Sequence, residues 1–340
     1  MTKSLHANKK ITVIAEAGVN HNGDFTKALE LIDVAADCGA DFIKFQTFKA
    51  ANLVTASAGL AAYQATTTSY SNQLEMLTDL ELKHEWHQSL VEHAESKSIG
   101  FITTPFDVEA IAFLSQLRMD LFKIPSGEIT NLPYLREISK LGKSVILSTG
   151  MANLGEIETA IEALTSSGLD RNKITLLHCT TEYPAPVEEV NLSVMETLKI
   201  AFNLPVGYSD HTEGITISIA AAAMGARVIE KHFTLDRRLP GPDHKASIEP
   251  DDLKKMVESI RQVEQAIGSP VKQPSPSELK NIISVRKSLV ASKFIEKGEQ
   301  FSLDNVTTKR PATGISPMRI DEIMGRVAHK SFKQDELIIL

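Results

Sequence analysis

ITVIAE, at residues 11–16, is the first of eight short apolar segments in this chain that end at or beside a residue able to do chemistry. The other seven are DFIKFQ (41–46), IGFITT (99–104), LFKIPS (121–126), SVILST (144–149), ITLLHC (174–179), PVGYSD (205–210) and RVIEKH (227–232). All are rich in Ile, Val, Leu and Phe with little alternation, which is typical of parallel strands covered on both faces. Segments with helical spacing, such as FTKALELIDVAADCG (25–39) and VEEVNLSVMETLKIAF (187–202), separate them. This repeated alternation predicts an α/β fold, and specifically a (β/α)8 barrel, with an open sheet as the alternative.

A parallel barrel gathers the carboxyl ends of its strands on one face, where barrel enzymes keep their active sites. The predicted strand ends bring polar residues to that face: Glu16, Lys44, Gln46, Thr103, Thr104, Lys123, Ser126, Ser148, His178, Ser209, His211 and His232. The same pattern therefore predicts both the fold and the place of the active site.

The composition is that of an ordinary globular protein, with 340 residues, 42% hydrophobic and 23% charged. The net charge of −7 argues against non-specific nucleic-acid binding. Cys38 and Cys179 have no C-x-x-C spacing, so the sequence supports neither a disulfide framework nor a cysteine-rich zinc site. No apolar run is long enough to span a membrane, and the N-terminus lacks a signal-peptide core, so we expect a cytoplasmic enzyme.

Two stretches interrupt the strand–helix pattern. Residues 47–82 form a long connection after the second predicted strand, and such a loop is usually a lid or a binding loop. GSPVKQPSPSE (268–278) is rich in Pro and Ser and indicates a break between domains. We therefore expect a catalytic barrel at 1–268, a linker at 269–283 and a small C-terminal domain at 284–340. That small domain is either a capping element or the carrier of Arg310 to an active site.

His211 and His232 form the strongest local signal, because they follow two consecutive predicted strands. Adjacent strands lie about 4.8 Å apart, so two imidazoles at their ends can share one metal ion. Together with oxygen ligands or water, such a pair suits Mn, Fe, Zn or Mg to varying degrees. The alternative is that one of the two is a hydrogen-bonded core histidine.

Lys44 and Lys123 each lie between two apolar residues at the end of a predicted strand. A buried lysine needs an anionic partner, which is either a bound phosphate or carboxylate or a structural glutamate. Thr103, Thr104, Ser126 and Ser148 add hydroxyl donors. Glu16 can act as a base, orient water or pair with a lysine, and its position alone leaves these three roles open.

Nucleotide binding and serine hydrolysis lack support, because the chain has no P-loop, G-x-G-x-x-G, G-x-S-x-G or H-E-x-x-H motif. A longer series of motifs is informative instead. It comprises AEAGVNHNG, KFQTFKA, TTPFD, FKIPSGEITNLPYL, STGMA, LHCTTEYPAP, GYSDHTEG, EKHFTLD, GPDHKAS and KRPATGISP. In order and spacing, from about residue 11 to the C-terminus, these motifs resemble the bacterial nonulosonic (sialic-type) acid synthases.

The resemblance implies a (β/α)8 barrel followed by a small antifreeze-like domain, in a homodimer whose tail domains cover the partner barrels. It implies condensation of phosphoenolpyruvate with an N-acylated hexosamine and water, with release of phosphate and dependence on a divalent metal, Mn or Mg. Glu16 would be the base or the group that orients water, and His211 and His232 the metal ligands.

The resemblance also assigns substrate contacts. The residues expected to bind phosphoenolpyruvate are Lys44, Thr104, Lys123, Ser126, Ser148 and Ser209. Those expected near the sugar are Gln46, Glu128, Tyr183, Glu230, Asp243 and, from the partner chain, Arg310.

Within this family, AEAGVNHNGD, SGEITNLPYL and HCTTEYPAP look closest to the synthases of N,N'-diacetyllegionaminate, which use 2,4-diacetamido-2,4,6-trideoxymannose. Thr181 stands where sialic acid synthases often have Asn, which suits a deoxygenated, N-acylated sugar. The alternatives are an N-acetylneuraminate synthase using N-acetylmannosamine and, after it, a pseudaminate synthase. An octulosonate-type enzyme is disfavoured by the tail. A non-catalytic carbohydrate-binding protein is disfavoured because Glu16, both histidines and both lysines are present.

Overall fold

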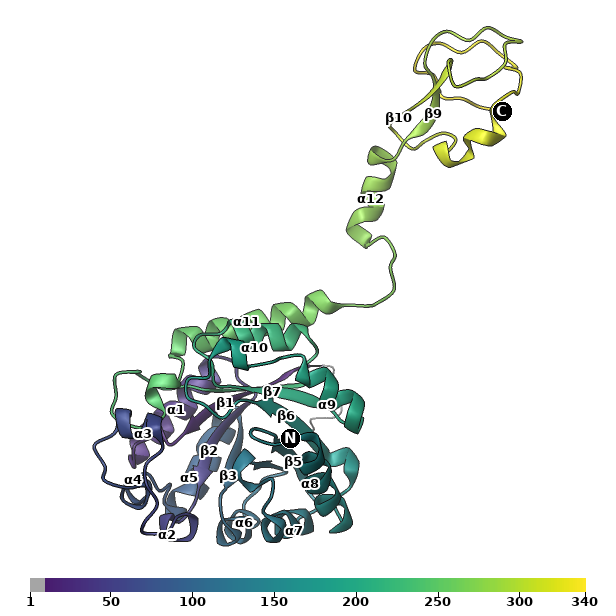
Figure 1. The fold of residues 1–340 in the computed structure, drawn as a ribbon. Coiled ribbons are helices and arrows are strands. Elements are labelled where there is room, and N and C mark those ends of the chain that lie inside the picture. The colour runs from purple at the N-terminus through teal and green to yellow at the C-terminus, as the bar shows by residue number, and fades with distance from the viewer. Residues whose placement is uncertain (1–9) are drawn as a thin grey trace. The chain divides into compact units, whose positions relative to one another are not determined.

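The computed structural model describes residues 10–340, and the chain divides into two compact units. The first unit ends at Gly268 and the second spans Ser269–Leu340. Figure 1 shows helices around a set of parallel strands in the first unit and a small two-stranded module in the second. Among the described helices, none has the length and apolar character needed to cross a bilayer.

Eight parallel strands form the centre of the first unit. They are β1 (Thr12–Gly18), β2 (Phe42–Thr47), β3 (Gly100–Pro105), β4 (Leu121–Ile124), β5 (Ser144–Ser148), β6 (Ile174–Cys179), β7 (Val206–Asp210) and β8 (Val228–His232). Their order is β3-β2-β1-β8-β7-β6-β5-β4, so the first and last strands of the sequence are paired. β3 and β4 lie in contact, although these two described strands share no hydrogen-bonded register. The predicted (β/α)8 barrel is confirmed, with a ring that closes at β3 and β4 by packing.

Eight helices follow the strands around the ring. They are α1 (Phe25–Asp37), α5 (His87–Ser96), α6 (Val108–Leu114), α7 (Leu132–Lys140), α8 (Leu154–Ser166), α9 (Val194–Phe202), α10 (Thr216–Ala223) and α11 (Pro250–Ile267). Polar N-caps start several of them, such as Asp24, Asp107 and Asn153, whose side chains accept hydrogen bonds from first-turn backbone N–H groups. Each cap fixes where a strand-to-helix loop ends, and these loops form the rim of the active-site face.

Two stretches differ from the expectation based on sequence. Residues 187–202 have the spacing of one helix, but Val187–Glu189 form only a 3-10 turn, and α9 begins at Val194. Asn191 between them has a φ of 50°, a left-handed conformation that interrupts a right-handed helix.

Residues 47–82, which we call the cover segment, are a folded element and not a structureless loop. They contain α2 (Ala50–Leu53), α3 (Ala62–Thr67) and α4 (Gln73–Asp79). Phe48, Met76 and Leu80 of the cover segment pack with Val19 from the loop after β1 in a small apolar cluster. Lys49 and Glu81 form an ion pair of 2.8 Å across the base of the cover segment.

The second unit begins with α12 (Pro276–Val285), which lies largely within the expected linker and starts at a capping box of Ser275 and Glu278. β9 (Ser288–Ala291) and β10 (Val306–Lys309) then pair in antiparallel fashion, and Pro317–Glu322 form a 3-10 turn. A small core of its own stabilises this unit: Leu289, Ala291, Ile295, Phe301, Val306, Ile323, Ala328, Phe332 and Ile338.

Asp41, just before β2, connects the start of the barrel to its last helix. Its Oδ2 accepts hydrogen bonds from the backbone N–H of Val13 at 2.9 Å and from Arg261 of α11 at 2.6 Å. Its Oδ1 accepts one from Lys10 at 2.7 Å. Burial raises the pKa of Asp41, but the hydrogen bonds from Lys10 and Val13 and the charge of Arg261 outweigh it, and the net pKa is lowered.

Asp41→Asn should destabilise the barrel by about 1–3 kcal/mol at neutral pH, because charge-assisted hydrogen bonds are lost. Since the pKa of Asp41 is lowered in the folded state, its contribution is complete above the ordinary aspartate pKa of about 4 and is lost as the pH falls below it. Urea unfolding between pH 7 and pH 3 measures this difference. A deficit of Asp41→Asn that stays constant down to pH 3 would contradict the lowered pKa.

Candidate active site

Side chains alternate in direction along each strand, and this alternation selects which strand-end residues face the barrel interior. Lys44 and Gln46 on β2, and Glu230 and His232 on β8, line one cavity. Their neighbours point outward: Lys231 forms an ion pair with Asp210 at 3.0 Å on the outer side of β7 and β8.

The same alternation points neighbouring residues at a predicted strand end to opposite sides of the barrel wall. Thr104 lines the cavity, whereas Thr103 Oγ1 lies 2.8 Å from Thr47 Oγ1 on the outer side of the barrel. Likewise Cys179 lines the cavity, whereas His178 Nε2 donates to the carbonyl oxygen of Val190 at 2.6 Å. Thr103 and His178 are therefore parts of the packing between strands and helices and lie outside the site.

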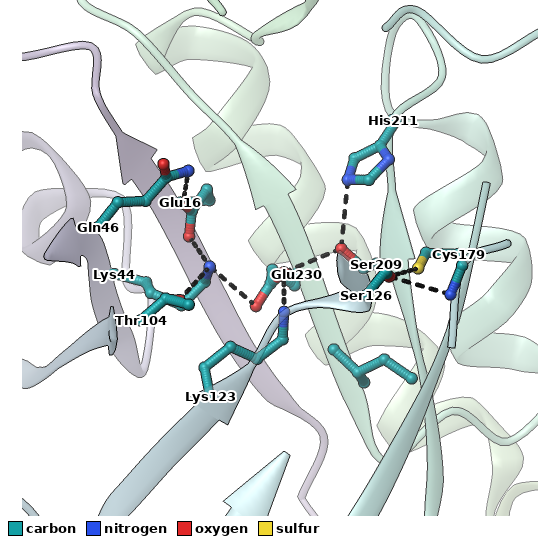
Figure 2. A network of polar contacts seen from close by, with 12 residues as sticks. Glu16, Lys44, Gln46, Thr104, Lys123, Ser126, Cys179, Ser209, His211 and Glu230 are labelled. Carbon is teal, nitrogen blue, oxygen red and sulfur yellow. Dashed lines mark hydrogen bonds and ion pairs between the residues drawn. The ribbon is translucent and has the colours of Figure 1, made fainter. Parts of the chain in front are cut away.

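Two lysines and two carboxylates form the floor of the cavity (Figure 2). Lys44 forms an ion pair with Glu16 and lies 3.6 Å from Glu230. Lys123 approaches the other oxygen of Glu230 at 3.1 Å, and the hydroxyl of Ser209 donates to this oxygen at 2.9 Å. Because all four charged groups are buried, each one needs the others for charge compensation.

The two carboxylates differ in their proton affinity. Burial raises the pKa of Glu16 to about 7, although the charge of Lys44 opposes this rise. Burial also acts on Glu230, but the charges of Lys123 and Lys44 prevail and lower its pKa to about 2. Two nearby acids with separated pKa values are typical of a site in which one group exchanges protons and the other stays ionised.

His211 and His232 lie beside each other, with ring centroids 5.6 Å apart. His211 Nδ1 donates to the carbonyl oxygen of Thr180 at 2.6 Å, so its Nε2 carries the lone pair. His232 Nδ1 is buried without a hydrogen-bond partner and lies 3.9 Å from Asp243 Oδ2. Burial lowers the pKa of both histidines, that of His211 to about 4, so both rings are neutral.

This pair fits a divalent metal ion, because neutral imidazole nitrogens are good ligands and the nitrogen of His232 has no other partner. Within residues 10–340 no group of three or more His, Cys, Asp or Glu side chains is arranged to hold an ion. The two histidines would therefore be the protein ligands, with oxygen ligands from water or substrate completing the coordination.

The remaining predicted residues complete the wall. Ser126 Oγ accepts a hydrogen bond from Gly150 N at 3.0 Å, and Gln46 Nε2 donates to Glu16 Oε1 at 3.4 Å. The ring of Tyr183 lies 4.2 Å from that of His211, between centroids. Burial raises the pKa of Asp243 to about 6, with the charge of Lys44 opposing the rise.

The cavity has a volume of about 400 Å³, within the range of small-molecule sites. It is lined by fourteen of the residues expected from the sequence: Glu16, Lys44, Gln46, Thr104, Lys123, Ser126, Glu128, Ser148, Tyr183, Ser209, His211, Glu230, His232 and Asp243. Arg310 belongs to the second unit, Ser269–Leu340. Glu230, expected near the sugar, lines the cavity and lies between the two lysines.

Sequence reasoning missed the apolar part of the wall, which includes Phe48, Leu53, Val54, Met76, Leu77 and Phe106. The sequence contains a signal for Phe48. Residues 44, 46 and 48 alternate along the chain, so Phe48, just after β2, faces the same side as Lys44 and Gln46. Sequence reasoning also missed Cys179 as a cavity-lining residue, whose Sγ lies 3.3 Å from Ser126 Oγ.

A parallel barrel with a buried lysine–carboxylate cluster and a histidine pair in one cavity at its strand ends has the arrangement of a barrel enzyme, whose active site lies at that face. Residues 31–272 match the NeuB family and residues 286–338 match the SAF domain, and the chain belongs to the NeuB family. It is 59% identical over 331 residues to the N,N'-diacetyllegionaminic acid synthase of Campylobacter jejuni, covering 97% of this chain and 99% of that protein.

Two further relatives agree with this assignment. The N,N'-diacetyllegionaminic acid synthase of Legionella pneumophila is 48% identical over 92% of this chain and 89% of its own length. The crystal structure of the N-acetylneuraminic acid synthetase of Leptospira borgpetersenii superposes with a TM-score of 0.71 at 36% identity, covering 80% of this chain and 90% of that one.

Gly150→Ala should impair binding of phosphoenolpyruvate, the substrate that the resemblance assigns to this part of the wall. A Cβ at Gly150 would lie 2.3 Å from Thr181 Oγ1 and 2.8 Å from Ser126 Oγ, so both of these side chains must move. We expect a rise in the KM for phosphoenolpyruvate of about tenfold or more, because small displacements of substrate-positioning groups are costly. Gly59→Ala is the control, since a Cβ there meets nothing within 4 Å. Equal kinetics for the two variants would contradict a tight fit at Gly150.

Proposed function

We propose that this chain condenses phosphoenolpyruvate with 2,4-diacetamido-2,4,6-trideoxymannose and water to give N,N'-diacetyllegionaminate and phosphate. The observation that carries the proposal is the buried cluster of Lys44, Lys123, Glu16 and Glu230 beside the histidine pair, in a chain 59% identical to a synthase of that name. C3 of phosphoenolpyruvate bonds to the aldehyde carbon of the sugar. Water bonds to C2, and the C2–O bond breaks, so that phosphate leaves with the bridging oxygen.

Phosphoenolpyruvate binding is the part of the reaction that the lysines serve. With Glu16 protonated, Lys44 and Lys123 outnumber Glu230, and the floor carries a net positive charge. Hydroxyl groups around these ammonium groups offer further donors: Thr104, Ser126, Ser148 and Ser209. Because Lys44 and Lys123 are buried, such fixed donors stabilise a phosphate and a carboxylate more strongly than they would at the surface.

Glu16 is the proposed base or water-orienting group. A carboxyl with a pKa of about 7 takes up and releases protons near neutral pH, which general acid–base catalysis requires. The hydrogen bond from Gln46 Nε2 holds one oxygen of Glu16, and Lys44 approaches the other. These two contacts hold the carboxyl group in place, which supports the proposal that Glu16 orients the water that attacks C2.

His211 and His232 would hold the divalent metal, Mn or Mg. When bound, this ion supplies a Lewis acid that polarises the aldehyde oxygen. The hydrogen bond of His211 Nδ1 to the carbonyl oxygen of Thr180 keeps Nε2 directed into the cavity, as is usual for metal-binding histidines.

The sugar is proposed to contact Gln46, Glu128, Tyr183 and Asp243 on the same wall, with Glu230 acting mainly on the lysines. Thr181 lines the cavity as well, and its short side chain supports a deoxygenated, N-acylated sugar over a fully hydroxylated one.

We also propose a domain-swapped homodimer in which Arg310 reaches the cavity of a second copy. Two observations support an apolar partner for the tail: Leu279 and Ile283, one helical turn apart on α12, are 55% and 58% exposed. On the barrel, Met151 at the cavity mouth is 73% exposed.

Because phosphoenolpyruvate is an intracellular metabolite, we propose that the enzyme acts in the cytoplasm.

Phosphate release from phosphoenolpyruvate tests the proposed reaction. With Mn present, we expect 2,4-diacetamido-2,4,6-trideoxymannose to support faster release than N-acetylmannosamine. Preference for N-acetylmannosamine would make the chain a sialate synthase and would remove the argument from Thr181. His211→Ala is the control for the metal: it should lose both turnover and Mn binding by calorimetry while keeping its circular dichroism spectrum. Full activity of His211→Ala would contradict the metal assignment.

Mixing two inactive variants tests the shared site. Glu16→Gln and Arg310→Ala each disable one component, so a mixed dimer of the proposed kind contains one cavity with both residues intact. Activity should therefore return to about a quarter of the wild-type value after random subunit exchange, since half of the dimers are mixed and each has one working site. Mixed dimers verified by mass spectrometry that stay inactive would contradict a site shared between chains.

A further inference from the structure

The polarity of the cavity changes with height above the strand ends. The inward positions run from Lys44 and Gln46 on β2 to Phe48 just after that strand, and from Thr104 on β3 to Phe106 just after it. Phe48 and Phe106 pack edge to face, with ring centroids 6.1 Å apart and an interplanar angle of 87°. The lower part of the cavity is therefore charged, and the part above it begins with two aromatic rings.

The cover segment continues this apolar surface. Leu53 and Val54 of α2 and its C-terminal end line the cavity, and so do Met76 and Leu77 of α4. Gln73, Met76, Leu77 and Leu80 lie at positions i, i+3, i+4 and i+7, so one face of α4 and of the residue that follows it points to the cavity.

Charged groups of the cover segment are engaged elsewhere. Glu75 Oε2 accepts a hydrogen bond from Ser71 N, and Asp79 Oδ2 accepts one from the hydroxyl of Tyr70 at 3.0 Å. Glu81 binds Lys49 and the backbone N–H of Ala50 at 2.8 Å, at the base of the segment. Among the described residues of the cover segment, those that line the cavity above Phe48 are apolar except for Gln64 and Gln73, whose amides lie 3.3 Å apart.

Building on the proposed function, the reaction fixes the direction of the sugar. Its aldehyde carbon must meet C3 of phosphoenolpyruvate, which the lysines hold at the strand ends, and the histidine pair lies at the same level. The opposite end of the open-chain sugar, from C4 to C6, then extends upward toward Phe48, Phe106 and the cover segment.

We propose that Phe48, Leu53, Val54, Met76, Leu77 and Phe106 form an apolar chamber that binds the C4–C6 end of the sugar and selects a 6-deoxy sugar over its 6-hydroxy counterpart. A C6 methyl group buries apolar surface against this wall, which favours binding. A C6 hydroxyl group would lose its hydrogen bonds to water and find few partners here, which costs binding free energy. The methyl of a 4-acetamido group also buries apolar surface against this wall, which favours binding in the same way. A hydrophobic pocket of this kind discriminates by about tenfold to two hundredfold.

Three sugars separate the contributions of C4 and C6: N-acetylmannosamine, 2-acetamido-2,6-dideoxymannose and 2,4-diacetamido-2,4,6-trideoxymannose. The first two differ only in the oxygen at C6. For the wild type, we expect kcat/KM to be about tenfold or more higher for 2-acetamido-2,6-dideoxymannose than for N-acetylmannosamine.

Two variants make the chamber polar. Leu77→Asn and Val54→Thr should each reduce this ratio by about threefold or more, the usual scale of one lost apolar contact, and leave the KM for phosphoenolpyruvate unchanged. Leu60→Asn is the matched control, because Leu60 packs against the same small cluster but does not line the cavity. Val54→Thr nearly preserves side-chain shape, so the test stands even if Leu77→Asn folds poorly.

An unchanged ratio in Val54→Thr and in folded Leu77→Asn, or an equal change in Leu60→Asn, would overturn the chamber. A wild type that prefers N-acetylmannosamine would overturn both the chamber and the proposed sugar. If the chain does not catalyse the condensation at all, the wild type releases phosphate with none of the three sugars. In that case calorimetry with the two alditols made by reducing the first two sugars still tests the chamber. The proposal is supported if the wild type binds the 6-deoxy alditol more tightly than the 6-hydroxy alditol and Val54→Thr removes this difference. Equal binding of both alditols to the wild type contradicts it.

Discussion

The buried charge cluster of Lys44, Lys123, Glu16 and Glu230 is the constraint on which the site depends. An isolated ammonium or carboxylate in the barrel interior would cost several kcal/mol, so none of the four groups can be buried alone. Glu230 contacts both lysines and the hydroxyl of Ser209, and its ionised form is strongly favoured as a result. Glu16 then shares this environment with an acid that is already ionised, and burial keeps its own proton affinity high.

The histidine pair lines the same cavity as the charge cluster, but both imidazoles are uncharged. Burial lowers the pKa of His211 and His232 and keeps both rings neutral, which preserves their lone pairs. A barrel of eight converging strands can hold cations for an anion and neutral nitrogens for a metal within one cavity, because each strand contributes its own end residue.

Much of the fold was predictable, because strand periodicity and helix spacing are local properties of the sequence. The eight strands lie where the apolar segments predict them, and fourteen expected site residues line the cavity. The direction of Thr103 and Thr104, by contrast, depends on strand parity, which a short continuous apolar run does not reveal. The place of Glu230 depends on two lysines from distant strands, and the cover segment depends on packing against Val19.

The cover segment is also one continuous stretch of chain, with short helices and its own apolar cluster, fastened at its base by Lys49 and Glu81. The residues proposed to make and break bonds lie at the strand ends instead. With the proposed roles, evolution can exchange or reshape this single insert while the reaction chemistry stays intact. A barrel organised in this way would be modular, because the proposed change of sugar acceptor would be confined to about one tenth of the gene.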